Sequence, residues 1–454
     1  MKYANAINKM SMAFNSFYGL LGFAVPSIAM LLAYPILIHR FGATKVGIYF
    51  LATSASGTLA FLDVGMSAAT LKFVAEDVAK GEKRAAADTV VTSLLFYSVV
   101  GIVVGTAFWI CSPLLVSLFS IRGSLQVSSL WLFRLGAVQF AVSFVSTVFL
   151  SLFKGVQRFD LSALVLSSLS LTTYGGAAIV ALWNNSRIID IMAVSLISNV
   201  LMLLISTVVG VKVCRSAGIQ LIAGRFSVIT LRRLFGFGSA MFVHNLTAIF
   251  FSQIQRLLVG ALIGPAAVSA YVLATTVLAK AHQLISAATE IMFPVASSNS
   301  ENMLLRRLYL RMLFGSAILS LLILIPLTVF SSPILDIWIG TSISDTASRL
   351  IPILVVGFFF MSISPAPFYM VNGLGRPWFN VTFDLLNVAV AVLAIGMLTL
   401  TNEITLNKFA WAFTVSNVIT GLAFQTAVEL LIWRKHLPFH KLLVQKLRQK
   451  RGDI

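Results

Sequence analysis

The stretch that decides the fold comprises residues 89–112, TVVTSLLFYSVVGIVVGTAFWICS, which contain no charged side chain. A helix that crosses the hydrocarbon core of a bilayer, about 30 Å thick, needs roughly 20 apolar residues, and this stretch is long enough. Its apolar residues are continuous, whereas a strand of a membrane barrel alternates with a period of two. The pattern therefore predicts a transmembrane helix.

The rest of the chain repeats this pattern. The 454 residues are 58% hydrophobic and only 11% charged, whereas a soluble domain carries about 25% charged residues. We find twelve apolar runs: 14–38, 47–70, 89–112, 131–150, 161–183, 190–211, 236–263, 267–293, 312–332, 350–371, 379–400 and 408–433. The first is longer than the apolar region of a secretory signal peptide and lacks a small-residue cleavage site, so we expect it to be retained. The sequence predicts an all-α polytopic membrane protein with twelve transmembrane helices.

The basic residues indicate the orientation of these helices. The 33 Lys and Arg outnumber the 15 Asp and Glu, which gives a net charge of +18 and a pI near 10.3. Such a pI is typical of nucleic-acid-binding proteins, but a chain this apolar cannot present a soluble basic domain. With the N-terminus inside, the inside segments hold 24 of the 33 basic residues and the outside segments six, which is the positive-inside pattern. We expect both termini to be cytoplasmic, with a basic tail at 434–454, and no nucleic-acid partner.

A weak internal repeat divides the spans into two sets of six. A shift of 222 residues places Gly42–Thr53 over Gly264–Thr275 with six of twelve positions identical, at the hairpins after spans 1 and 7. A shift of 218 residues superposes the Gly-x-x-Arg motifs that end at Arg158 and Arg376. Because six is even, the halves have the same orientation, and transporters built this way rock two lobes around a central site. We expect two parallel six-helix lobes.

The expected domain boundaries follow from this division. They are an N-lobe at 1–211 (helices 1–6), a cytoplasmic interlobe linker at 212–235, a C-lobe at 236–433 (helices 7–12) and the tail at 434–454.

Motifs of enzyme and cofactor chemistry do not stand out. His436 and His440 are four residues apart but have no acidic or thiol ligand between them. The chain has no GxxxxGK[ST] loop, so ATP cannot be the direct energy source. We expect a protein that is not an enzyme and holds no metal or other cofactor.

The beginning of the chain resembles a known family. Span 1 carries Pro26 and Pro35, and it is followed by RFGATKVGIY at 40–49 and LDVGM at 62–66. These resemble the Pro-rich first helix, the FG…GxY hairpin and the LDxG motif of O-antigen flippases. These flippases form the polysaccharide transporter branch of the multidrug/oligosaccharidyl-lipid/polysaccharide (MOP) exporter superfamily.

Later stretches resemble the same branch. They are LRRLFGFG at 231–238, QRLLVG at 255–260 followed by Tyr271, KGVQRF at 154–159 and NGLGRP at 372–377. The first two resemble the entry into helix 7 and a DRxxxG…Y stretch, and the others resemble the short loops after helices 4 and 10. Gln255 stands where an Asp is common, which puts an ion-pairing role of that Asp in doubt here.

The resemblance runs the full length of the chain. It implies twelve helices in two MATE-like lobes and export of an undecaprenyl-diphosphate-linked oligosaccharide (an O-antigen, capsule or exopolysaccharide repeat unit) across the bacterial inner membrane. The substrate would move from the cytoplasmic to the periplasmic leaflet by alternating access, with ion coupling. The implied partners are this lipid-linked oligosaccharide, membrane lipid, a polysaccharide polymerase and a chain-length regulator.

Four basic side chains are candidates for binding this substrate: Lys280, Arg256, Arg134 and His244. A charge within a membrane span costs about 2.5–3.5 kcal/mol on insertion scales and is a functional hypothesis by default. A diphosphate is the natural counter-charge for such cations in a low-dielectric cavity. Lys280 and Arg256 lead, because the resemblance places spans 1, 2, 7 and 8 against the interlobe cavity. Arg134 and Arg256 could instead snorkel to the headgroups, and His244 could be a packing residue.

Two acidic residues and two prolines complete the candidates. Asp63 and Glu290 lie toward the inner ends of spans 2 and 8, and they could take up a proton or sodium ion that drives exchange. Alternatively, Asp63 could cap or pair locally, and Glu290 could pair with a nearby base. Pro26 and Pro35 remove backbone donors within span 1 and could make it a hinge.

Other functions stay open on sequence alone. A cation-coupled multidrug exporter of the same superfamily would need acidic residues deep in the lobes, but the intramembrane residues are mainly basic. The lipid II flippase branch usually has two extra C-terminal helices. A membrane-embedded polysaccharide polymerase or glycosyltransferase would have a large polar outer loop, and the outer loops are short. The sequence therefore favours the oligosaccharide flippase.

Overall fold

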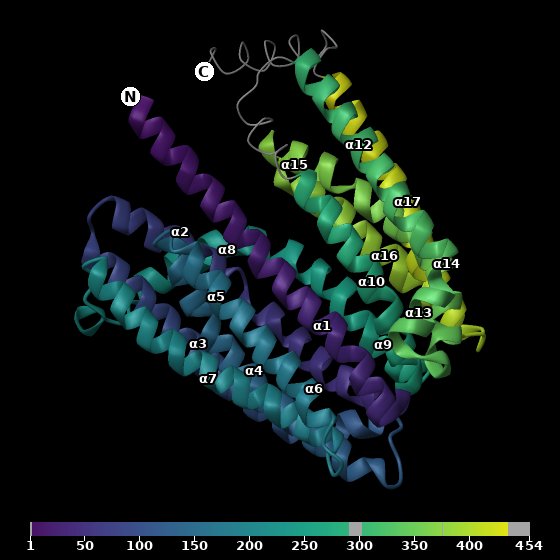
Figure 1. The fold of residues 1–454 in the computed structure, drawn as a ribbon. Coiled ribbons are helices and arrows are strands. Elements are labelled where there is room, and N and C mark those ends of the chain that lie inside the picture. Colours follow the sequence, from purple (N-terminus) through teal and green to yellow (C-terminus); the bar gives the residue numbers. More distant parts are fainter. Residues whose placement is uncertain (1, 290–301, 375, 435–454) are drawn as a thin grey trace, which may run out of the picture. The chain divides into compact units, whose positions relative to one another are not determined.

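The computed structural model describes residues 2–289, 302–374 and 376–434 (Figure 1). Within these ranges the regular structure is entirely helical. Glu290 and residues 435–454 of the predicted tail lie outside the described residues.

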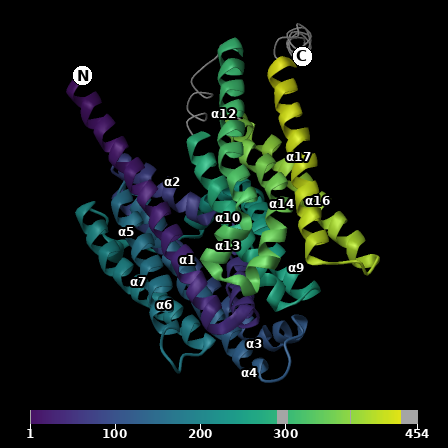
Figure 2. The same cartoon turned by 45° about the vertical axis from the view of Figure 1, so that its right-hand side comes forward.

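The first half of the chain consists of long helices joined by short turns. The elements are α1 (Lys2–Thr58), the 3₁₀ helix η1 (Leu59–Asp63), α2 (Met66–Ala79), α3 (Lys83–Leu118), α4 (Leu125–Gly155), α5 (Phe159–Ser170), the π-helix η2 (Leu171–Gly175), α6 (Gly176–Ala181) and α7 (Ile188–Ser216). In Figures 1 and 2, α3, α4 and α7 lie side by side, and α1 runs along α5 and α6.

Small residues bring α3 and α4 together. A Cβ atom on Gly101 or Gly105 of α3 would lie 3.3 or 3.2 Å from the carbonyl oxygen of Ala141 or Ala137 of α4. This Gly-x-x-x-Gly spacing lets the two backbones approach closely, which is how membrane helices associate when lipid is as apolar as their side chains.

The second half is also a series of helices. The elements are the 3₁₀ helix η3 (Leu221–Ala223), α8 (Val228–Ile249), the π-helix η4 (Phe250–Ile254), α9 (Gln255–Leu262), α10 (Pro265–Thr289), α12 (Asn302–Val329), α13 (Ser331–Ile339), α14 (Thr341–Ile363), α15 (Pro365–Gly373), α16 (Pro377–Leu400) and α17 (Leu406–Arg434).

The predicted spans coincide with these helices. In the described part of the chain, nine helices are long and apolar enough to cross a membrane. One of them, Ala24–Asp63, combines parts of the first two predicted spans, and Leu246–Leu262 is a shorter apolar helix within the predicted span 236–263. The last predicted span is α17, which is outside the nine. The protein is therefore an all-α polytopic membrane protein, and twelve spans are consistent with its helices.

Helix α1 is interrupted at one glycine. Gly42 has the only non-helical backbone angles within it (φ +79°, ψ 165°), and the helix continues through Pro26 and Pro35. Gly264, the equivalent of Gly42 in the 222-residue repeat, also has a positive φ of +124°. Glycine adopts such angles without the steric cost that a Cβ atom would add. The sequence repeat thus corresponds to a glycine turn in both hairpins.

The two hairpins also contact each other through equivalent positions. Ser269 Oγ donates to the carbonyl oxygen of Ala43 at 2.7 Å. The equivalent of Ser269 in the other hairpin is Gly47, where a Cβ atom would lie 1.8 Å from the carbonyl oxygen of Pro265, the equivalent of Ala43. The residue at the Ser269 position of each hairpin contacts the residue at the Ala43 position of the other, as in an interface with two-fold symmetry.

The contacts divide the chain into two compact units. The first contains Met1–Val272 and Trp338–Ile343, and the second contains Leu273–Ile337 and Ser344–Ile454. Within the first unit, α8 packs on α2, and η4 and α9 pack on α1. The predicted lobe boundary around 212–235 stays a prediction.

Candidate functional site

Arg256 lies in the first turn of α9 among tyrosines from three other elements. Its guanidinium interacts electrostatically with the hydroxyl groups of Tyr34 on α1, Tyr174 in η2 and Tyr271 on α10. Tyr174 belongs to the π-helix η2, and Arg256 lies two residues after the end of the π-helix η4. Single π turns within α-helices occur frequently at functional sites. We name Arg256, the three tyrosines and the neighbouring Gln255 the Arg256 cluster.

The Arg256 cluster holds one buried polar atom without a hydrogen-bond partner. Tyr34, Tyr271 and Gln255 are 7%, 1% and 1% exposed. The Tyr271 hydroxyl donates to Gln255 Oε1 at 2.5 Å, and Gln255 Nε2 is buried without an acceptor. If the amide were turned around, its oxygen would be the orphan instead. The cluster therefore has hydrogen-bonding capacity that the described side chains do not use.

The second feature of the Arg256 cluster is the positive charge of its arginine. Among the described residues no acidic side chain forms an ion pair with Arg256. Gln255, which stands where the resembling family often has Asp, is neutral and bonds to Tyr271. A partly buried cation without a carboxylate favours an anionic ligand.

Lys280 lies on α10 in the second compact unit and is partly buried. Its Nζ donates to Gln283 Oε1, one turn later, at 3.2 Å. Its binding role stays a prediction. The side chain of His244, on α8, lies outside the described residues.

Arg134 has aromatic neighbours. On α4 its guanidinium lies over the rings of Trp109 and Trp131, 5.2 and 5.4 Å from their centroids, and its Nε is buried without an acceptor. Tryptophan collects at the level of the membrane interface, so these contacts support the snorkelling alternative for Arg134.

Asp63 closes the turn between η1 and α2. Its carboxylate accepts from the Ser67 backbone N–H (3.1 Å), the Ser67 hydroxyl (2.8 Å) and the Tyr97 hydroxyl. The next two residues, Val64 and Gly65, both have positive φ. The geometry supports the local capping alternative, and the role of Asp63 in ion coupling stays a prediction.

Comparison with known proteins assigns the chain to a family. A model of the family described as "Polysaccharide biosynthesis protein" matches residues 41–348. The chain belongs to this family. It is also 22% identical over 368 residues to a Shigella flexneri protein described as an O-antigen transporter, and the match covers 81% of this chain and 86% of that one.

Solved structures confirm the predicted MOP fold. The chain resembles an inward-facing multidrug resistance MATE family transporter of the MOP superfamily, with a TM-score of 0.75, 14% identity and coverage of 91% of this chain and 98% of that chain. It also resembles the lipid II flippase MurJ in an inward closed conformation, with a TM-score of 0.69, 11% identity and coverage of 92% and 87%. This member of the polysaccharide biosynthesis family is thus a multi-pass helical membrane protein with the fold of MOP transporters.

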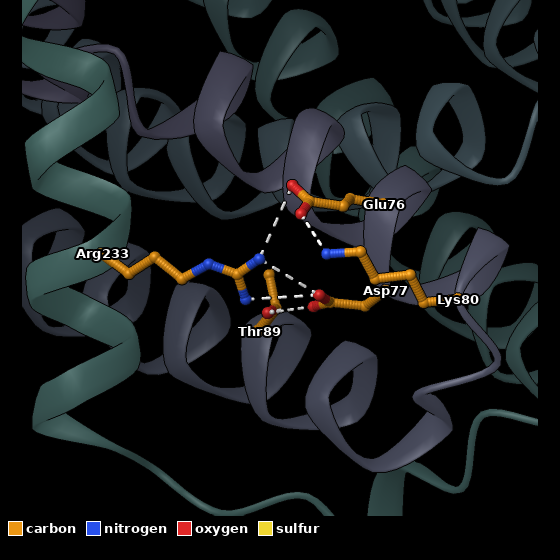
Figure 3. A network of polar contacts seen from close by, with 5 residues as sticks. All are labelled: Glu76, Asp77, Lys80, Thr89 and Arg233. Atoms are coloured by element: carbon orange, nitrogen blue, oxygen red, sulfur yellow. Dashed lines mark hydrogen bonds and ion pairs between the residues drawn. The ribbon is translucent and has the colours of Figure 1, made fainter.

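In this family member, sequence reasoning missed a buried ion pair. Both terminal nitrogens of Arg233 on α8 donate to Asp77 Oδ1 on α2 at 3.2 Å, and the Thr89 hydroxyl of α3 donates to Asp77 Oδ2 at 3.3 Å (Figure 3). Asp77 is fully buried, and the Arg233 guanidinium lies 3.9 Å from the ring centroid of Phe73. The sequence signal was an acidic residue beyond the end of a span, but no spacing rule pairs residues 156 positions apart.

The ion pair has a surface extension. Lys80 Nζ donates to Glu76 Oε1 at 2.6 Å, and Glu76 Oε2 lies 3.7 Å from Arg233 (Figure 3). The hydrogen bond from Lys80 lowers the pKa of the Glu76 carboxyl below its usual value. Together these contacts hold the start of α8 against α2 and α3.

Proposed function

We propose that this protein is a flippase that carries an undecaprenyl-diphosphate-linked oligosaccharide from the cytoplasmic to the periplasmic leaflet of the bacterial inner membrane. Family membership and the similarity to an O-antigen transporter support a lipid-linked sugar as the cargo. The fold shared with MurJ supports the movement of a large lipid-linked molecule across the bilayer. The protein moves its substrate without changing a covalent bond.

The Arg256 cluster is the observation that carries this proposal. A diphosphate carries the negative charge that would balance Arg256. Its phosphate oxygens can accept two parallel hydrogen bonds from one guanidinium group. The orphan amide N–H of Gln255 supplies a neutral hydrogen-bond donor beside that charge. A neutral donor contributes to the binding of the anion without adding a second positive charge. The anion can therefore leave when the site opens to the other side.

The proposal also includes the movement, the orientation and the coupling of the protein. Two lobes of parallel orientation would open in turn to the two sides of the membrane, with both termini in the cytoplasm. Lys280 and Arg134 are further candidates for contact with the substrate, and Asp63 and Glu290 are candidates for uptake of a coupling ion. A polysaccharide polymerase and a chain-length regulator would act on the exported units.

Deletion of the gene in its host and complementation with variants test the proposal. Loss of surface polysaccharide together with accumulation of the lipid-linked repeat unit inside the cell is the expected deletion phenotype. Arg256→Gln should fail to complement at normal protein level. Arg187→Gln is the matched control, because Arg187 is exposed, pairs with Asp190 and precedes the predicted span 190–211. If the polysaccharide survives and dye efflux falls, the protein is a multidrug exporter.

A further inference from the structure

One hydrogen bond connects α1 to the segment between α12 and α14. The indole Nε1–H of Trp338 donates to the main-chain carbonyl oxygen of Leu31 at 2.6 Å. Within a helix this carbonyl would accept from the N–H four residues later. That later residue is Pro35, which has no N–H. The proline therefore leaves an acceptor on α1, and the indole occupies it.

The residues next to Trp338 also pack on α1. Trp338–Ile343, which we name the strap, belongs to the first compact unit, whereas the chain on both sides of it belongs to the second. Gly340 in the strap has φ +76°, and a Cβ atom there would lie 2.5 Å from the imidazole of His39 on α1. A left-handed glycine therefore permits this close approach. Ile339 is fully buried.

The clamped turn of α1 carries part of the Arg256 cluster. Leu31 and Pro35 bound one helical turn, and Tyr34 lies within it. A helix is free to bend where a proline removes a backbone hydrogen bond. An external donor on the freed carbonyl opposes that bending, and Tyr34 moves with the turn.

We propose that Trp338 is a positioning residue that fixes Tyr34 beside Arg256 by clamping the carbonyl that Pro35 leaves without a helical donor. This inference rests on the proposed function, because Arg256 is there the residue that binds the anionic headgroup. It assigns Pro35 a role different from a free hinge: the proline creates the acceptor by which the strap holds α1.

Hydrogen–deuterium exchange of the full-length protein in nanodiscs tests the clamp without any substrate. Trp338→Phe removes the N–H donor and keeps an aromatic ring, and we expect amides in 36–40 and in the strap to exchange roughly fivefold faster. Trp378→Phe, at a tryptophan of α16 that is 61% exposed, is the matched control and should change neither region. Unchanged exchange in Trp338→Phe overturns the inference.

The prolines provide a second test of the shared acceptor. Pro35→Ala returns an N–H to the helix and should also speed exchange in the strap. Pro26→Ala is its control, because the carbonyl four residues earlier, that of Gly22, accepts no side-chain donor from the described residues. The Pro35→Ala, Trp338→Phe double variant should exchange no faster in the strap than the more affected single variant. If the increases in exchange rate of the two single variants multiply in the double variant, the two substitutions do not act on one shared acceptor.

Binding of undecaprenyl diphosphate in detergent tests the positioning itself. We expect Kd to rise about tenfold in Arg256→Gln and about fivefold in Trp338→Phe, with no further rise when Trp338→Phe is added to Arg256→Gln. If Arg256→Gln weakens binding and Trp338→Phe does not, although its exchange rises, the strap clamps α1 without positioning Tyr34 and the inference is wrong. If Arg256→Gln leaves Kd unchanged, the proposed function fails at this site and the positioning role fails with it.

Discussion

Replacing Arg233 with Gln isolates the ion pair that holds α8 against α2. The substitution removes both guanidinium donors to Asp77 Oδ1, each at 3.2 Å. Asp77 is fully buried. Among the described side chains, the Thr89 hydroxyl, at 3.3 Å, then remains as its hydrogen-bond donor. The substitution leaves a buried carboxylate without its counter-charge, and this raises the free energy of the folded state.

The expected cost follows from the burial of the two partners. Removing one partner of a buried ion pair costs about 3–5 kcal/mol. The Arg233 side chain is 37% exposed, so solvent already screens part of the attraction, and water can reach the vacated position. We therefore expect the free energy of unfolding to fall by about 2–3 kcal/mol. This figure includes about 0.5–1 kcal/mol for the lost contact between the guanidinium and the Phe73 ring.

Unfolding of the full-length protein in SDS titrations measures this cost. A double-mutant cycle of Arg233→Gln and Asp77→Asn should give a coupling energy of at least about 1.5 kcal/mol. Lys80→Gln is the control, because the Lys80–Glu76 pair has side chains 55% and 34% exposed and an exposed pair of this kind adds little to stability. If Arg233→Gln costs no more than Lys80→Gln, or the coupling falls below about 0.5 kcal/mol, the reasoning is refuted.

Two further predictions concern packing and pH. Gly47→Ala places a methyl group against the Pro265 carbonyl oxygen and should destabilise the protein by more than about 2 kcal/mol in the same titration. Gly396→Ala, where a Cβ atom meets nothing within 4 Å, should be neutral or slightly stabilising; equal effects would contradict the close approach. Because Lys80 lowers the pKa of Glu76 in the folded protein, the stability that this pair adds is present above the unfolded pKa and is lost as pH falls through the folded one. The SDS midpoint of Lys80→Gln should therefore fall less steeply than that of the wild type below about pH 5, and parallel curves would contradict it.

The membrane-spanning helices were predictable because hydrophobic length is a local property of sequence. The described residues of each of the twelve predicted spans are mainly helical, because a backbone in lipid must satisfy its hydrogen bonds within the segment. The repeat was visible because both hairpins need glycine where φ is positive, at Gly42 and Gly264. The two hairpins' mutual contact was not visible, since no local rule brings Gly47 to Pro265.

The sequence predicted the charged residues of the candidate site but not the residues that surround them. Arg256 attracted notice because a base within a span is costly, but its tyrosine neighbours come from α1, η2 and α10 and meet only after folding. Of the two tryptophans at Arg134, Trp131 is three residues earlier on the same helix, whereas Trp109 comes from α3 and meets Arg134 only after folding. Pro35 looked like a hinge because the sequence shows a missing donor and cannot show that Trp338 occupies the freed acceptor.

The sequence by itself determined that this protein is helical, lies in a membrane and carries isolated bases within its spans, because hydropathy and charge act over one helix length. Only the tertiary structure decided what surrounds each base: Arg233 forms an ion pair with Asp77, and the Arg134 guanidinium lies over the rings of Trp109 and Trp131. It left Arg256 without an acidic partner among the described residues. The ion pair joins residues that are 156 positions apart in the chain. Such contacts arise from the packing of helices against one another, and the hydrophobic periodicity of the sequence does not predict them.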